Sequence, residues 1–215
     1  PLLAALGTLL LAQVLQAATS VIDQFWAARA GQGSVAVMGY ANRLLFLVLG
    51  LGSVAIGRVL LPTFARLSAG QTQHIHQARQ LAQVWAWRVF GLSTLSLLVL
   101  WPLAPWLVAT LFERGAFGPA DTQRVAAFLQ VSWLQVPTTL ASLVLIQQVL
   151  AEQRYRVLTL LAATNLLVKL LGNSLLTPWL GLQGLALASA LMPVSTLLVL
   201  LLWWRKAPHP SQHAS

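Results

Sequence analysis

The chain has 215 residues, of which 58% are hydrophobic and only 8% are charged. Soluble domains carry about 25% charged residues, so this composition excludes a soluble surface and indicates an integral membrane protein. The 13 Lys and Arg residues outnumber the four Asp and Glu residues and give a net charge of +9. The basic residues lie mostly at the ends of apolar runs, which indicates membrane topology and not nucleic-acid binding.

The first apolar run begins at Pro1 and continues without a charge as far as Asp23. A membrane helix needs roughly 20 mainly apolar residues, so we expect a helix over 1–30. Because the run starts immediately, we expect the chain to be a fragment cut at or near the start of a helix. The glycines of 31–34 predict a turn after this helix.

The rest of the chain alternates between long apolar runs and short polar stretches. Polar residues predict a loop or surface helix at 68–80, and EQRYR predicts a basic turn at 152–156. Further membrane helices are expected over 35–67, 81–112, 125–151, 157–177 and 182–204. The fold class is therefore all-α, a polytopic bundle of about six transmembrane helices over 1–206, with a polar tail at 207–215.

The charges on the connections predict the orientation of the bundle. One set of connections carries six basic residues: Arg66, Arg79, Arg154, Arg156, Arg205 and Lys206. The other set carries three, Arg29, Arg114 and Arg124, together with Glu113 and Asp121. Cytoplasmic loops of membrane proteins are enriched in Lys and Arg, so we expect the first set, both chain termini and the polar tail in the cytoplasm.

Arg43 lies in the segment GYANRLLF with no acidic residue near it along the chain. A charge near the bilayer centre costs at least about 2.5–3.5 kcal/mol, and such residues usually face a bundle interior or a water-filled cavity. Tyr40 and Asn42 flank Arg43 and suit a hydrated cavity, so we interpret Arg43 as functional. The alternative is that its side chain reaches the headgroups. That alternative is preferred for Arg88 and stays open for Arg58.

Lys169 belongs to a polar stripe on an otherwise apolar helix. Asn165, Lys169 and Asn173 follow at i, i+4 and i+8, which places them on one helix face. A buried lysine needs a partner, and Asp23 is the only acid within a predicted span. We therefore expect an Asp23–Lys169 pair between the first and fifth predicted helices. A structural pair and an ion- or proton-coupling site both remain open.

The other polar residues give little support for chemistry. His74 and His76 are spaced i, i+2, which does not place both on one helix face, and no third ligand lies nearby. No phosphate-binding glycine loop and no Ser-His-acid set is evident. We expect no enzyme, no metal site and no cofactor.

Four segments together resemble the MurJ/MviN lipid II flippase family, within the larger MOP exporter superfamily. They are ID at 22–23, GSVAVMGYANRLLFLVLGLGSVAIGRVLLPTFARLSAG at 33–70, LFERGAF at 111–117 and GLQGLALASAL at 181–191. The YANRL-to-LLPT and LFERGAF segments are the most specific. The resemblance implies that this chain is the C-terminal lobe and that an N-terminal lobe of the same protein is missing.

The resemblance also implies a function. Such proteins translocate an undecaprenyl-linked peptidoglycan precursor, lipid II, across the bacterial inner membrane by alternating access. Arg43, with Tyr40, Asn42 and Arg58, would line the cavity and meet the substrate pyrophosphate, for which a guanidinium is suited. Phe46 stands where some relatives have an acid, which leaves Arg43 less neutralised. Alternatives are a flippase for another lipid-linked oligosaccharide, another MOP-type exporter, or a non-transporting membrane interaction module.

Some members of the family have a sodium site, and its position can be compared with this chain. The positions that match are Asp23, Asn165, Lys169 and Ser189. Lys169 departs from the pattern, because such sites expect an oxygen donor there. An ammonium would occupy the place of the ion, so we expect no sodium binding.

Overall fold

The computed structural model describes residues 2–68 and 72–206, and the predicted polar tail lies outside them. These described residues form seven α-helices and no strand. The helices are α1 (Leu2–Arg29), α2 (Ser34–Ser68), α3 (Thr72–Phe112), α4 (Pro119–Trp133), α5 (Gln135–Ala151), α6 (Tyr155–Leu180) and α7 (Leu182–Lys206).

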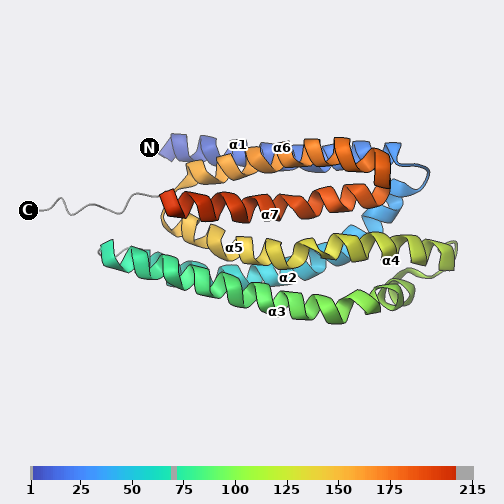
Figure 1. Ribbon diagram of the computed structural model, residues 1–215, viewed down its shortest axis with the longest axis horizontal. Helices are drawn as coiled ribbons and strands as arrows, with labels where there is room; N and C mark the ends of the chain where they lie inside the picture. Colours follow the sequence, from blue (N-terminus) through green and yellow to red (C-terminus); the bar gives the residue numbers. More distant parts are fainter. Residues whose placement is uncertain (1, 69–71, 207–215) are drawn as a thin grey trace, which may run out of the picture.

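The helices lie side by side along the long axis of the molecule (Figure 1). The connections α2–α3 and α5–α6 lie at one end of the molecule, which we call the α5–α6 end. The start of α1 and the end of α7 lie at this end too. The connections α1–α2, α3–α4 and α6–α7 lie at the opposite end, which we call the α3–α4 end. Basic residues at 66, 79, 154 and 156 therefore share one end, and those at 29, 114 and 124 share the other.

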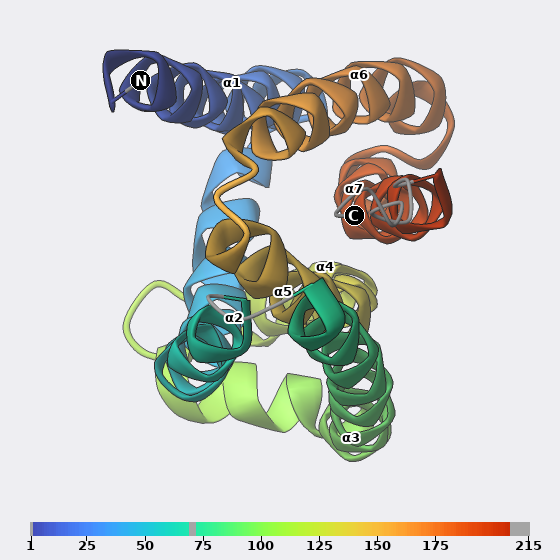
Figure 2. The ribbon, with the colours of Figure 1, turned by 90° about the vertical axis from the view of Figure 1, so that its left-hand side faces the viewer.

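Two groups of helices make up the bundle (Figure 2). In one group α1 and α6 pack along each other, and in the other α5 packs against both α2 and α3. Helix α7 joins the groups, because it packs against α6 on one side and against α4 and α5 on the other.

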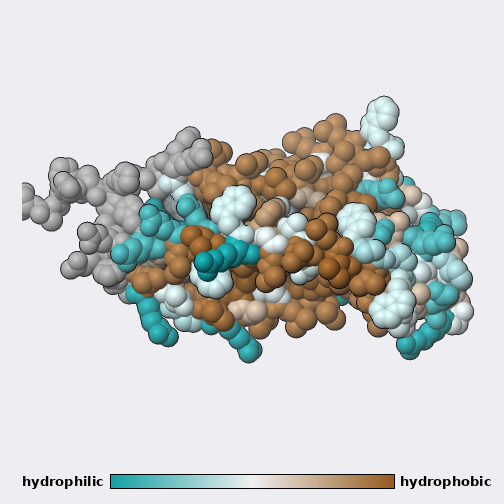
Figure 3. All heavy atoms as spheres, turned by 60° about the horizontal axis from the view of Figure 1, so that its bottom comes forward, coloured by the Kyte–Doolittle hydropathy of each residue, from teal (hydrophilic) through white to brown (hydrophobic). Residues whose placement is uncertain are grey.

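Five segments of the described chain are long and apolar enough to cross a membrane. They are Ser34–Leu67, Gln77–Phe112, Pro119–Ala151, Tyr155–Leu180 and Leu182–Trp204. Helix α1 is not among them, although it lies alongside α6 (Figure 2). Apolar residues cover the middle of the molecule and hydrophilic residues gather toward its two ends (Figure 3), as a bilayer requires. The predicted all-α membrane bundle is confirmed.

Proline shapes the segment predicted as one helix over 125–151. It begins earlier, at Pro119, and divides at Leu134 into α4 and α5. Pro137 has no N–H to donate to the carbonyl of Trp133, so the helical ladder is interrupted at this point. A proline at the first helical position is favourable because its missing N–H is not needed there, which explains the start at Pro119.

Two other helices are longer than expected. Most of the polar stretch 68–80 belongs to α3, which is helical from Thr72. Helix α6 continues through Pro178 to Leu180 and ends at Gly181, whose φ of +58° favours glycine. The helix α3 thus extends into polar sequence before its apolar run, and α6 extends into proline-containing sequence after its own.

The apolar core forms two clusters along the bundle. Residues such as Leu45, Val108 and Leu129 make the cluster toward the α3–α4 end. The cluster toward the α5–α6 end includes Phe64 and Leu200, both completely buried. Each cluster takes side chains from α2, so this long helix holds the two halves of the bundle together.

Candidate functional site

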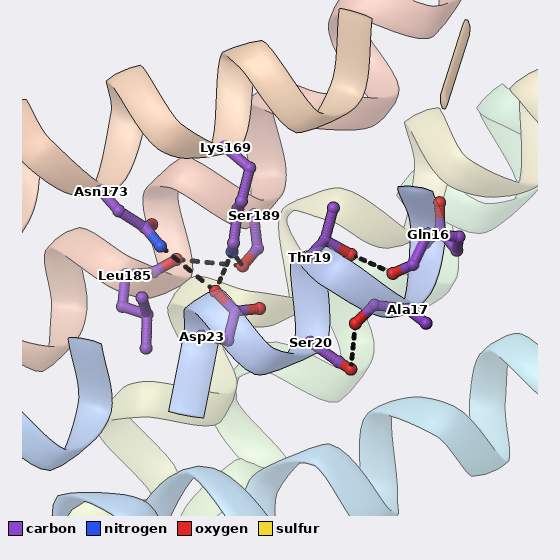
Figure 4. A network of polar contacts seen from close by, with 9 residues as sticks. All are labelled: Gln16, Ala17, Thr19, Ser20, Asp23, Lys169, Asn173, Leu185 and Ser189. Atoms are coloured by element: carbon purple, nitrogen blue, oxygen red, sulfur yellow. Dashed lines mark hydrogen bonds and ion pairs between the residues drawn. The ribbon is translucent and has the colours of Figure 1, made fainter. Parts of the chain in front are cut away.

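An ion pair joins α1 to α6 inside the bundle. The Lys169 ammonium lies 2.6 Å from a carboxylate oxygen of Asp23, and it also donates a hydrogen bond to the Ser189 hydroxyl of α7 (Figure 4). Lys169 is completely buried, and the Asp23 side chain is 25% exposed. Because an unpaired buried charge is costly, the ammonium fixes the three helices relative to one another.

Neutral polar groups complete this network. The Asn173 amide donates to the same carboxylate oxygen of Asp23 at 3.3 Å, and the Ser189 hydroxyl donates to the carbonyl of Leu185 at 3.0 Å. Asn173 is completely buried. It lies one helical turn beyond Lys169, so the i, i+4 spacing of the polar stripe was the signal for its place in the site.

Asn165 lies outside this network. Its side-chain carbonyl accepts hydrogen bonds from the hydroxyls of Ser195 and Thr196 on α7, at 3.1 and 3.0 Å. The predicted set of Asp23, Asn165, Lys169 and Ser189 is therefore divided, since only three of the four meet. Asn165 forms a second, separate contact between α6 and α7.

Small residues bring α6 and α7 close enough for these contacts. A Cβ on Gly184 would lie 2.3 Å from the backbone carbonyl oxygen of Leu176, and one on Gly172 would lie 2.8 Å from the Cβ of Ala188. Small residues allow helix backbones to approach in membrane proteins. Gly184 and Gly172 thus set the distance at which Lys169 reaches Ser189.

Arg43 stands on α2 in the half of the molecule nearer the α3–α4 end, and it is exposed. Its guanidinium carbon lies 5.3 Å from the centre of the Tyr40 ring. Asn42 beside it is half-buried. The residues of the YANRL segment therefore share about one turn of helix, and the guanidinium lies at the surface of the bundle.

Arg58 does not join the Arg43 group. It is exposed on α2 fifteen residues further along, or about 22 Å away at 1.5 Å per residue. Fifteen steps of 100° leave it about 60° around the helix from Arg43. The two arginines therefore stand at different depths on one side of α2.

All four acidic residues are described, and each has its own partner. Asp23 pairs with Lys169, and Glu152 pairs with Arg79. Glu113 accepts a hydrogen bond from the Thr122 hydroxyl, and Asp121 accepts one from the N–H of Gly118. Among the described residues no carboxylate is paired with Arg43, and no group of three His, Cys, Asp or Glu residues could hold a metal ion.

A second ionic cluster lies at the α5–α6 end, and the sequence did not predict it. The Arg79 guanidinium donates two hydrogen bonds to the Glu152 carboxylate at 2.8 and 2.7 Å, and Arg154 lies 3.3 Å from the same group. Both guanidiniums lie over the Trp203 ring, at 5.6 and 5.2 Å. This cluster links α3, the α5–α6 turn and α7.

The surroundings of Glu152 change its acidity. Burial alone would raise the pKa of the Glu152 carboxyl. Hydrogen bonds from Arg79 and Gln148, and the charges of Arg79 and Arg154, outweigh burial and hold that pKa below its ordinary value. The carboxylate is therefore the stable form throughout the neutral range.

Comparison with known proteins places this arrangement in a family. The family described as "Lipid II flippase MurJ" matches residues 2–213. A probable lipid II flippase MurJ of Rhizobium tropici is 32% identical over 160 residues, which are 74% of this chain and 30% of the relative. The lipid II flippase MurJ of Burkholderia cenocepacia is 30% identical over 187 residues, which are 86% of this chain and 36% of the relative.

Solved structures show the same fold. A lipid II flippase MurJ in an inward closed conformation has a TM-score of 0.77 and 21% identity, with 94% of this chain and 41% of that chain covered. An outward-facing multidrug resistance MATE transporter of the MOP superfamily has a TM-score of 0.74 and 15% identity, covering 94% and 44%. The chain spans about a third of the length of the curated relatives that it matches. Because the family match takes in nearly all of its residues, the chain belongs to the lipid II flippase MurJ family.

Proposed function

We propose that this chain is one lobe of a flippase that moves a polyprenyl-linked peptidoglycan precursor, lipid II, across the bacterial inner membrane by alternating access. The family match supports the substrate class. The share of the relatives' length that it covers supports a single lobe. An N-terminal lobe of the same protein would then provide the opposite wall of the transport cavity.

The observation that carries this proposal is Arg43. It is an exposed guanidinium within the apolar span Ser34–Leu67, and among the described residues it has no carboxylate partner. Exposure to lipid would be costly for such a charge, whereas a cavity wall would hydrate it. A guanidinium that keeps its full charge can form bidentate hydrogen bonds with the pyrophosphate of a lipid-linked glycan. Arg58 would face the same pathway nearer the α5–α6 end.

The distribution of charge supports an orientation. The described part of the α5–α6 end carries six basic residues and a single acid, Glu152; the basic residues are Arg66, Arg79, Arg154, Arg156, Arg205 and Lys206. At the α3–α4 end three basic residues, Arg29, Arg114 and Arg124, are offset by Glu113 and Asp121. Under the positive-inside rule the α5–α6 end faces the cytoplasm, as do the two ends of the chain.

A drug-cation exporter is less well supported. Recognition of a cation requires acids in the cavity, and each acid in this chain has a partner within its own lobe. The likeness to the MATE transporter is a likeness of fold alone. A flippase for a different polyprenyl-linked glycan would use the same arginine, so the assay below compares substrates.

The proposal is tested with Arg43→Ala in the full-length protein, expressed in a strain depleted of its own lipid II flippase. We expect loss of complementation at normal membrane levels, with partial function in Arg43→Lys, which keeps the charge but loses the bidentate geometry. Arg88→Ala is the matched control, because Arg88 is also an exposed arginine of an apolar helix beside an aromatic ring.

Normal growth with Arg43→Ala would remove Arg43 from the mechanism and with it the basis of the proposal. A flipping assay with purified protein in vesicles then decides the substrate. Transport of lipid II supports the proposal. If only a different polyprenyl-linked glycan is transported, that glycan replaces lipid II as the proposed substrate. If neither is transported, the remaining alternative is a non-transporting membrane interaction module.

A further inference from the structure

The two most specific sequence segments meet at one aromatic ring. Tyr40 belongs to the YANRL segment of α2, and Phe112 and Phe117 belong to the LFERGAF segment at the end of α3. The Tyr40 ring centre lies 5.0 Å from that of Phe112 and 5.1 Å from that of Phe117, at interplanar angles of 60° and 72°. Tilted and edge-to-face contacts at this distance are favourable for aromatic pairs.

The turn after α3 is built to return the second phenylalanine to this cluster. Gly115 has a φ of +61°, a left-handed conformation that residues with a Cβ rarely adopt. The N–H of Phe117 then donates to the carbonyl of Arg114 at 3.2 Å. The ring of Phe117 comes to lie 6.3 Å from that of Phe112, and both contact Tyr40.

Arg43 lies near the same tyrosine ring. It follows Tyr40 by three residues, so the two side chains share one face of α2, and the guanidinium carbon is 5.3 Å from the ring centre. The aromatic cluster belongs to the half-buried edge of the core, whereas the guanidinium is exposed. The three half-buried rings therefore support an exposed cation.

We propose that Tyr40 is the positioning residue for Arg43, and that Phe112 and Phe117 hold Tyr40 in place. The inference rests on the proposed function, in which Arg43 binds the substrate pyrophosphate. An aromatic face attracts a guanidinium without neutralising it, whereas a carboxylate would cancel the charge that the pyrophosphate needs. The ring also limits the rotamers of Arg43, which lowers the entropy lost on binding.

The test replaces Tyr40 by phenylalanine and then by phenylalanines carrying one, two and three ring fluorines, in the full-length protein in lipid nanodiscs. Fluorine withdraws charge from the ring face while the volume changes little, so the cation–π attraction weakens stepwise. The probe is a polyprenyl pyrophosphate, and its dissociation constant is measured for each variant. We expect binding to weaken stepwise from Tyr40→Phe to the ring with three fluorines, by about two- to five-fold in total. The maximal flipping rate is expected to stay constant while the half-saturating substrate concentration rises.

Two controls test whether weaker binding comes from the contact between the Tyr40 ring and Arg43 or from a general effect of changing an aromatic ring. In an Arg43→Ala background the fluorine series should be flat, because the cation is gone. Trp85→Leu removes a comparable ring, 5.4 Å from the guanidinium carbon of Arg88 on α3, and should leave pyrophosphate binding unchanged.

The outcomes also separate this inference from the proposed function. A flat or tightening series in the presence of Arg43, with Arg43→Ala still defective, overturns the positioning role alone. Full binding and transport by Arg43→Ala overturns the proposed function as well. Weakening of the series in both backgrounds shows that the ring acts through packing and not through Arg43.

Discussion

The two ionic clusters of this lobe differ in depth and in composition. Inside the bundle, one ammonium on Lys169 meets one carboxylate on Asp23, and only neutral side chains complete the site. At the α5–α6 end, one carboxylate on Glu152 meets two guanidiniums and lies 5% exposed, while the Arg154 side chain is 49% exposed.

This difference shows what each cluster can contribute. An ion pair with one completely buried partner is often no more stabilising than apolar residues of the same shape, although loss of the other partner is severe. The Asp23–Lys169 pair therefore specifies the arrangement of α1, α6 and α7 more than it adds stability. The Glu152 cluster keeps contact with water through Arg154, and its bidentate hydrogen bonds from Arg79 stabilise the turn and helix ends.

The largest effect is expected from breaking the buried pair on one side. Asp23→Asn leaves the completely buried Lys169 ammonium without a counter-charge, and we expect a loss of about 3–5 kcal/mol of stability. Thermal unfolding in detergent measures it. The double variant Asp23→Asn with Lys169→Met should recover most of the loss. A double variant as unstable as the single one would mean that the pair itself stabilises the fold.

The next effect concerns the helix contact that supports the buried pair. Gly184→Ala places a Cβ 2.3 Å from the backbone oxygen of Leu176, so α6 and α7 must separate, and we expect a loss of about 3 kcal/mol. Gly52→Ala is the matched control, since its Cβ meets the end of the Leu140 side chain, which can rotate. Equal unfolding temperatures for the two variants would contradict this account of the α6–α7 contact.

A smaller effect is expected from acid at the α5–α6 end. The pKa of Glu152 is lower in the folded protein than its ordinary value. The unfolded chain thus takes up the proton first, and this stabilisation is present above the ordinary pKa and lost as pH falls through the folded one. We expect the protection of the α5–α6 turn from hydrogen exchange, relative to an unfolded chain at the same pH, to decrease below about pH 4. Glu152→Gln should exchange faster at neutral pH and show less of this acid response. An acid response unchanged in that variant would assign it to another group.

No effect is expected from sodium. The Lys169 ammonium already occupies the centre of the buried network, where it contacts Asp23 and Ser189. Flipping in vesicles should proceed at the same rate when sodium is replaced by choline at constant ionic strength. A clear sodium requirement would contradict the view that the ammonium excludes the ion.

The sequence was informative where polar residues stand out against an apolar background. A single acid and a single lysine within predicted spans left one pairing for Lys169, and the structure holds its ammonium against Asp23. The register of α7 relative to α6 could not be predicted from the sequence in the same way, because it depends on how closely Gly184 lets the backbones of the two helices approach. The contact of Asn165 with Ser195 and Thr196 on α7 was therefore not foreseen.

The second cluster could not be found by the same reasoning. Arg79 and Glu152 lie far apart in the sequence, and each is surrounded by other polar residues, so neither stands out. The EQRYR segment was interpreted only as a basic turn. The start of α4 at Pro119, earlier than the expected 125, could have been predicted from the sequence. Pro119 follows Gly118 and precedes Asp121, which is a recognisable pattern for the first turn of a helix.

The covalent attachment of the Lys169 ammonium to α6 has a consequence for energetics. A diffusible ion that occupied this network would enter from one side of the membrane and leave to the other, so each turnover would draw on a gradient. In the proposed transport cycle, an ammonium that is carried by the chain and keeps its proton returns to its starting point and moves no net charge across the bilayer. The membrane potential then does no net work on this ammonium over the proposed cycle, and a driving force would act through the substrate or through another part of the protein.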